Sequence, residues 1–139
     1  MKYLRWLLAA AVALYALMVA VPATFTLLYK LRLLVLTDIV KSHEALMDTL
    51  SWPRVILLCA VVILYFVAAW RLALAKGRAW LVFAIAYVGD ALGWLWMQGP
   101  VYDATFPPGQ RQSNLTIIAV MAVVGLLIAW VDLSKTRAN

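Results

Sequence analysis

The segment VILLCAVVILYFVAAWRLALA (Val55–Ala75) is followed after three residues by AWLVFAIAYVGDALGWLWMQ (Ala79–Gln98), and this pair decides the fold. Each segment is close to the ~20 residues that an α-helix needs to cross about 30 Å of hydrocarbon. Neither shows the alternation of apolar and polar residues that is typical of barrel strands, and a helix satisfies its own backbone hydrogen bonds in lipid. We therefore predict two transmembrane helices joined by a short basic turn.

Two further apolar segments, at about 4–28 and 115–131, extend this pattern to four predicted spans. The chain is 67% hydrophobic and 13% charged, whereas soluble domains carry about 25% charged residues. A water-soluble core has no room for this much apolar surface. The sequence thus predicts an all-α, integral membrane four-helix bundle that forms a single domain over residues 1–139.

The first span contains a proline and begins like a signal peptide. Lys2 and Arg5 precede an apolar run, and Val21-Pro22-Ala23 resembles a cleavage site. We interpret the segment as a retained helix with a candidate kink at Pro22, because proline removes an internal hydrogen bond and clashes with the preceding turn. The alternative is that the helix simply ends at this proline.

Basic residues are distributed unevenly between the two sides of the predicted bundle. The turn with Arg71, Lys76 and Arg78 is the strongest basic cluster, and it shares its side with both termini. Because Lys and Arg favour cytoplasmic loops, we predict that both termini face the cytoplasm, in a bacterial inner membrane. Tryptophans near the span ends are predicted interfacial anchors: Trp52, Trp70, Trp80, Trp94, Trp96 and Trp130.

The connection between the first two spans contains a predicted amphipathic helix at about 35–50. Apolar residues recur there at helical spacing, and charged side chains occupy much of the remaining surface. We expect this helix to lie in the outer membrane–water interface, either as a solvated cap or as a docking surface for a partner. The later loop, 99–112, is rich in proline and glycine, which predicts turns without regular helix.

Asp90 is the one formal charge near the middle of a predicted span, and it is the best functional lead. A carboxylate at bilayer depth costs at least ~2.5 kcal/mol, so it usually has a partner or a function. Gly89 and Gly93 form a GxxxG pattern beside it, and small residues four apart let helices approach closely. We therefore expect Asp90 to face another helix. Three roles for Asp90 stay open. It is a structural group that hydrogen-bonds a neighbouring helix, a partner for a basic or polar group of another subunit, or the carboxylate that couples proton or cation movement in a small transporter.

Residues for other chemistries are missing or isolated. The chain has a single histidine, His43, and a single cysteine, Cys59, so no metal site, haem or other cofactor is predicted. No Ser–His–Asp pattern or phosphate-binding glycine loop is present, and no catalytic residue is assigned. The net charge of +6 comes from Lys and Arg scattered at span ends, which favours lipid headgroups over nucleic acid.

The function favoured by the sequence is that of a non-enzymatic accessory or scaffolding subunit, which packs through its third span into a larger membrane complex. The GxxxG beside Asp90 supports this interpretation, as do the polar groups, which are too few to line a pathway. The alternative is a small proton- or cation-coupled transporter that acts as a homo-oligomer with Asp90 in its pathway. A membrane enzyme is the third interpretation. The expected partners are the lipid bilayer and either other membrane-protein subunits or copies of the same chain.

Overall fold

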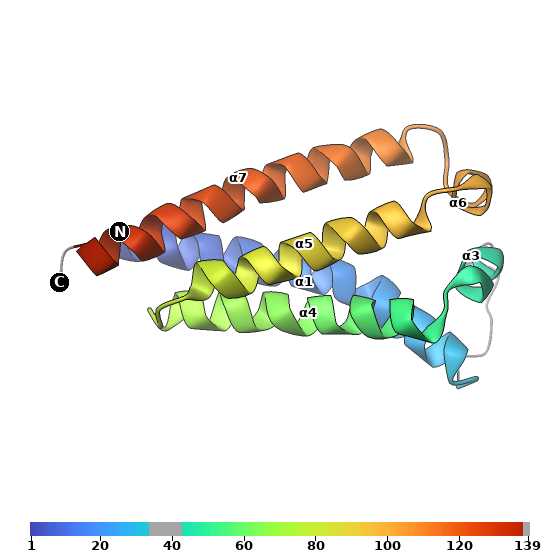
Figure 1. Ribbon diagram of the computed structural model, residues 1–139, viewed down its shortest axis with the longest axis horizontal. Coiled ribbons are helices and arrows are strands. Elements are labelled where there is room, and N and C mark those ends of the chain that lie inside the picture. Colours follow the sequence, from blue (N-terminus) through green and yellow to red (C-terminus); the bar gives the residue numbers. More distant parts are fainter. Residues whose placement is uncertain (34–42, 138–139) are drawn as a thin grey trace.

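The computed structural model describes residues 1–33 and 43–137, and these residues form α-helices and no strands. Four long helices run antiparallel in chain order (Figure 1): α1 (Lys2–Lys30), α4 (Trp52–Ala73), α5 (Ala79–Met97) and α7 (Gln110–Arg137). All four are long and apolar enough to cross a membrane, which supports an integral membrane location. The predicted all-α four-helix bundle is confirmed.

Two helices extend further than their apolar runs. The first, α1, continues through Pro22 to Lys30, so the proline does not end the helix. The Thr26 hydroxyl donates a hydrogen bond to the Pro22 carbonyl at 2.7 Å. The last, α7, starts at Gln110 with a polar turn in which Gln110 donates to the Asn114 side chain at 3.2 Å. Pairs four residues apart stabilise a helix surface, so this helix continues where the apolar residues stop.

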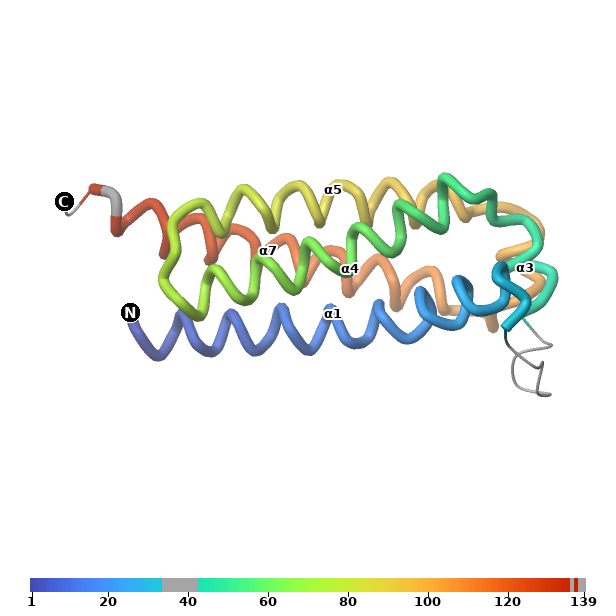
Figure 2. Tube along the Cα trace, turned by 90° about the horizontal axis from the view of Figure 1, so that it is seen from below, coloured from blue at the N-terminus to red at the C-terminus, as the bar shows by residue number. Residues whose placement is uncertain are grey.

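The two ends of the bundle are built differently. Both chain termini and the turn between α4 and α5 lie at one end, which we call the terminal end (Figures 1 and 2). The opposite end, called the capped end, carries two short helices that contact each other, α3 (Glu44–Thr49) and α6 (Pro100–Thr105). The amphipathic helix predicted at about 35–50 is thus helical over 44–49, while 34–42 lie outside the described residues.

The prediction of turns without regular helix over 99–112 is wrong. Pro100 begins α6, and α7 already starts at Gln110. Proline is favourable at the first position of a helix, because the N–H that it lacks has no intrahelical partner there. Gly99 (φ 155°) precedes α6 and Gly109 (φ 92°) precedes α7. These positive φ values suit glycine, so the glycines mark the turns between helices.

The packed core occupies the terminal half of the bundle. All four long helices contribute buried residues to one cluster: Leu8, Ala9, Val12, Ala16, Val61, Tyr65, Ala68, Ala69, Leu72, Ala79, Phe83, Ala86, Met121, Ile128 and Val131. Many of these residues are alanines, and small side chains let helices approach closely. Helix α1 packs extensively against α4 but little against α7, and α1 and α7 diverge toward the capped end (Figure 1). The capped half is therefore less tightly filled.

Candidate functional site

A cavity of about 510 Å³ lies in the capped half, next to the packed core. All four long helices line it, and residues of α3 and α6 lie across its end. Most of its wall is apolar, including Met18, Phe25, Leu57, Met97, Ile117 and Ile118. Small-molecule sites usually measure about 300–1,000 Å³ and combine apolar walls with a few polar groups. This cavity has the size and the lining of such a site.

Asp90 lies on the wall of this cavity, where the cavity meets the packed core. Two tyrosine hydroxyls donate to the same carboxylate oxygen, Oδ2: Tyr15 of α1 at 2.6 Å and Tyr65 of α4 at 3.0 Å. The two tyrosine rings meet edge to face, with their centroids 5.2 Å apart. One oxygen of Asp90 thus joins α5 to both α1 and α4.

The second carboxylate oxygen of Asp90, Oδ1, has no hydrogen-bond donor among the described residues. It is also not one of the fully buried polar atoms that lack a partner. No Lys, Arg or His within the described ranges forms an ion pair with Asp90. The carboxylate is therefore fixed through Oδ2 and still has an acceptor available through Oδ1.

Gly89 and Gly93 face α4 of the same chain. A Cβ added at Gly89 would lie 3.0 Å from Cγ2 of Val61, and one added at Gly93 would lie 3.7 Å from Cδ2 of Leu57. The close approach of α4 and α5 therefore depends on the missing side chain at Gly89. Both glycines also border the cavity, beside Asp90. The GxxxG pattern therefore packs α5 against α4 of the same chain.

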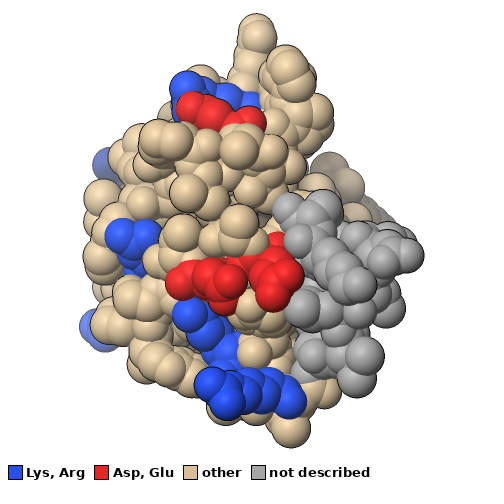
Figure 3. Space-filling view, turned by 90° about the vertical axis from the view of Figure 1, so that its right-hand side faces the viewer, with Lys and Arg blue, Asp and Glu red and all other residues tan. Residues whose placement is uncertain are grey.

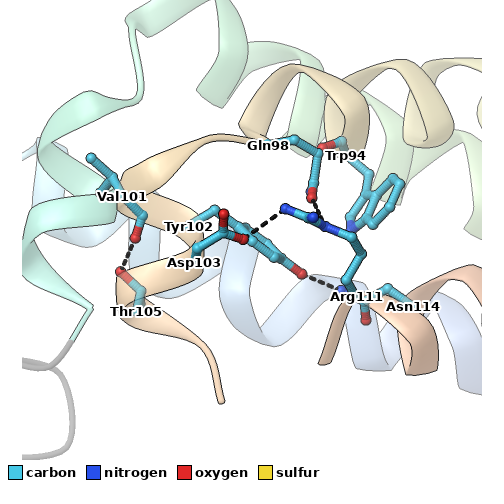
Figure 4. Close-up of polar contacts among 8 residues, drawn as sticks. All are labelled: Trp94, Gln98, Val101, Tyr102, Asp103, Thr105, Arg111 and Asn114. Atoms are coloured by element: carbon cyan, nitrogen blue, oxygen red, sulfur yellow. Dashed lines mark hydrogen bonds and ion pairs between the residues drawn. The ribbon is translucent and has the colours of Figure 1, made fainter. Parts of the chain in front are cut away.

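Polar contacts hold α6 across the ends of α5 and α7 (Figure 4). Arg111 donates from Nε to Gln98 Oε1 at 2.9 Å and forms an ion pair with Asp103 at 2.6 Å. Asn114 donates to the Tyr102 hydroxyl at 2.6 Å. Tyr102 is buried and lines the cavity, so these contacts position one part of the cavity wall at the capped end.

A second set of contacts holds α3 next to α1. The Tyr29 hydroxyl donates to Asp48 Oδ1 at 2.5 Å, and Glu44 Oε1 lies 3.5 Å from the same hydroxyl. The His43 ring meets the Phe106 ring edge to face at 5.4 Å between centroids, which links α3 to the end of α6. Figure 3 looks onto this end, where acidic and basic side chains both reach the surface. The two short helices thus form a cap that is polar outside and apolar inside.

Two polar groups near the cap are buried without partners. Nε of Arg54 and Nε1 of Trp94 donate no hydrogen bond to any described residue, and both side chains line the cavity. The Arg54 guanidinium lies over the Trp96 ring, with Cζ 4.4 Å from the ring centroid. Trp94 is four residues from Asp90, which corresponds to about 6 Å along α5. Near the cap, the described cavity wall thus has two donors without acceptors, Arg54 Nε and Trp94 Nε1, and the carboxylate of Asp90 lies deeper.

The predicted tryptophan anchors fall into two groups. The side chains of Trp52, Trp70, Trp96 and Trp130 are exposed on the bundle surface. Trp80 packs partly buried against the core cluster, and Trp94 lines the cavity. Trp94 therefore belongs to the candidate site.

Tyr15 and Tyr65 are site residues that the sequence analysis did not identify. They lie 75 and 25 residues from Asp90 in the chain, so no local motif connects them to it. One signal was present: each hydroxyl lies in the middle of an apolar span, at a depth similar to that of Asp90. Buried tyrosine hydroxyls usually have a hydrogen-bond partner, and few other polar groups exist at this depth.

Among residues 1–33 and 43–137, no three His, Cys, Asp or Glu side chains lie close enough to hold a metal ion. Comparison with protein-family models, curated proteins and solved structures finds no match to this chain.

Proposed function

We propose that the protein binds a largely apolar small molecule in the cavity of its capped half, as the binding step of a small transporter with Asp90 in its pathway. One observation carries this proposal: Asp90 lies on the wall of a cavity of about 510 Å³, with Oδ2 held by two tyrosines and Oδ1 without a donor among the described residues. A carboxylate that only joined helices would be expected to have both of its oxygens hydrogen-bonded within the bundle. Apolar walls with few convergent polar groups are typical of small-molecule sites.

The route into the cavity supports a ligand that arrives through lipid. Met18, Val21 and Phe25 of α1 line the cavity and are also exposed at the bundle surface. Helix α1 has little contact with α7, whose residues line the opposite side. A molecule dissolved in the bilayer would therefore enter between α1 and α7 without crossing water.

We also propose that the protein lies in a bacterial inner membrane with both termini in the cytoplasm, as the sequence predicts. The basic turn at the terminal end supports this orientation, because Lys and Arg favour the cytoplasmic side. The capped end and its cavity then face outward. Residues of one chain line the whole cavity, so a homo-oligomer is compatible with the proposal but is not needed to form the site.

An accessory role in a larger membrane complex is the second proposal. The GxxxG face of α5 is covered by α4, so a partner would contact another face of this helix. Exposed apolar residues follow one another on α5 at spacings of four and three: Leu81, Ile85, Val88, Leu92 and Leu95. This spacing is typical of a seam between two helices. Lipid chains cover such a face equally well, so the cavity remains the stronger argument.

Filling the cavity tests the first proposal. The protein in lipid nanodiscs is titrated with tetraphenylphosphonium, tetraphenylborate and triphenylmethanol, and bound probe is measured by equilibrium dialysis against protein-free nanodiscs. Ile118→Trp adds bulk to the cavity wall and should abolish saturable binding. Val123→Trp adds the same side chain at an exposed position of the same helix and should preserve binding. Saturable binding of none of the probes, or equal binding by the two variants, would contradict the proposal.

Native mass spectrometry after extraction in mild detergent separates the two proposals. An accessory subunit should travel with a different membrane protein at fixed stoichiometry. A ligand-binding transporter should travel alone or with copies of itself. A stable heteromeric complex that dissociates on Leu92→Asn would favour the accessory role.

A further inference from the structure

We infer that the ligand of this cavity is a lipophilic cation, such as an aromatic or alkyl amine or an onium ion, whose positive charge binds at Asp90. The inference rests on the proposed function and adds the charge of the ligand to it. Three features of the site carry it: the oxygen of Asp90 that no described residue binds, the lack of a positive partner for that carboxylate in the described part of the chain, and the aromatic residues that line the same cavity.

The carboxylate of Asp90 has an incomplete set of partners. Arg111 at the capped end forms its ion pair with Asp103 and not with Asp90. Tyr15 and Tyr65 supply two neutral donors, and both bind Oδ2. Buried carboxylates are normally paired with a cation and fully hydrogen-bonded, because desolvating a charge is costly. A ligand cation bound at Oδ1 would give the carboxylate of Asp90 the positive partner that it lacks.

Aromatic side chains stand next to this position. Tyr15 contributes both the hydroxyl bound to Asp90 and part of the cavity wall. Trp94 lies about one helical turn from Asp90 and lines the same cavity, and Phe25 and Phe106 line it further toward the cap. The faces of aromatic rings attract cations, more strongly where water is excluded. The remaining apolar wall suits the hydrocarbon part of such a ligand.

Arg54 is the feature that would favour an anionic ligand instead. Its guanidinium already lies over the Trp96 ring at 4.4 Å. Arg54 precedes Tyr65 by 11 residues of α4, which is roughly 16 Å along the helix. An anion at Arg54 would therefore occupy the capped end of the cavity, away from Asp90. Deeper in the cavity, the carboxylate of Asp90 would repel a negatively charged ligand. A cationic ligand therefore fits the site better, and preferential binding of an anion is one of the outcomes that the test can give.

Two probes of similar shape and opposite charge test the inference. In nanodiscs of zwitterionic lipid, saturable binding should favour tetraphenylphosphonium over tetraphenylborate by about tenfold or more. Asp90→Asn deletes the charge and keeps the size of the side chain, and it should weaken phosphonium binding by about tenfold or more. Asp132→Asn removes the same charge at the terminal end, where Asp132 accepts from the Trp80 backbone N–H, and should leave binding unchanged.

The comparison of the two probes on the unsubstituted protein needs no variant, so it tests the inference even where Asp90→Asn does not fold. Equal affinity for the two probes, a preference for the borate, or undiminished phosphonium binding in folded Asp90→Asn would overturn the inference while cavity binding stands. Absence of saturable binding by every probe would overturn the proposed function itself.

Discussion

Tyr15 and Tyr65 donate to the same oxygen of Asp90, so their contributions to stability should be coupled. Replacing each tyrosine by phenylalanine removes one hydroxyl and keeps the ring. Interhelical hydrogen bonds in membrane proteins contribute about 0.6 kcal/mol on average and at most about 1.7 kcal/mol. The Tyr15 bond is the shorter, at 2.6 Å against 3.0 Å, and shorter charge-assisted bonds are stronger. We expect Tyr15→Phe to cost about 1.5 kcal/mol and Tyr65→Phe about 0.5–1 kcal/mol.

The double variant should cost more than the sum of the two single variants. After either single change, the remaining tyrosine still satisfies Oδ2 of Asp90. After both changes the buried oxygen has no donor, and an unsatisfied buried polar group costs about 1–3 kcal/mol. The double variant should therefore lose about 3–3.5 kcal/mol, of which roughly 1 kcal/mol is coupling between the two sites.

Reversible unfolding in mixed micelles with increasing fractions of denaturing detergent, followed by circular dichroism, measures these free energies. The same two substitutions in an Asp90→Leu background serve as the control and should no longer destabilise the protein. The reasoning is refuted if the single costs add to within about 0.3 kcal/mol, the scatter expected for independent sites. It is also refuted if the tyrosine changes remain costly when Asp90 has been removed.

Two further predictions concern packing and the cap. Gly125→Ala should destabilise the bundle by about 1–3 kcal/mol, because the new Cβ would lie 2.7 Å from Cε1 of the buried Phe83 ring. Gly77→Ala, which meets nothing within 4 Å, is the matched control in thermal unfolding, and equal midpoints for the two would contradict the packing described. Arg111→Gln should cost at most about 1 kcal/mol, since its ion pair with Asp103 is 50% and 59% exposed. A loss above about 2 kcal/mol in detergent unfolding would show that the cap contributes to global stability.

The four long helices follow from the apolar runs of the sequence, because a chain with this little polarity has few other ways to satisfy its backbone in lipid. The short helix α6 does not follow from the composition of residues 99–112, because proline and glycine at this density are typical of turns. In fact Pro100 occupies the first turn, where proline favours a helix, and Gly99 supplies the turn before it. Composition alone does not distinguish these two uses of the same residues.

The candidate site was predictable only in part. The GxxxG beside Asp90 indicated a helix contact, and the structure finds α1 and α4 next to the carboxylate. Which polar groups meet it depends on the axial register of helices that are distant in sequence, so Tyr15 and Tyr65 carry no local signature. The cavity itself results from the divergence of α1 and α7. Its wall residues, such as Met18 and Leu57, have the same apolar character in the sequence as residues of the packed core.

The most direct test of the central claim is the carboxyl ¹³C chemical shift of Asp90 during titration with tetraphenylphosphonium. The protein is labelled at aspartate, held in nanodiscs, and its Asp90 resonance is assigned by its absence in Asp90→Asn. If Oδ1 of Asp90 faces a ligand cavity, this resonance should move saturably while that of Asp132 stays in place. A resonance of Asp90 that does not move at saturating probe, or that moves no more than that of Asp132, would contradict the claim.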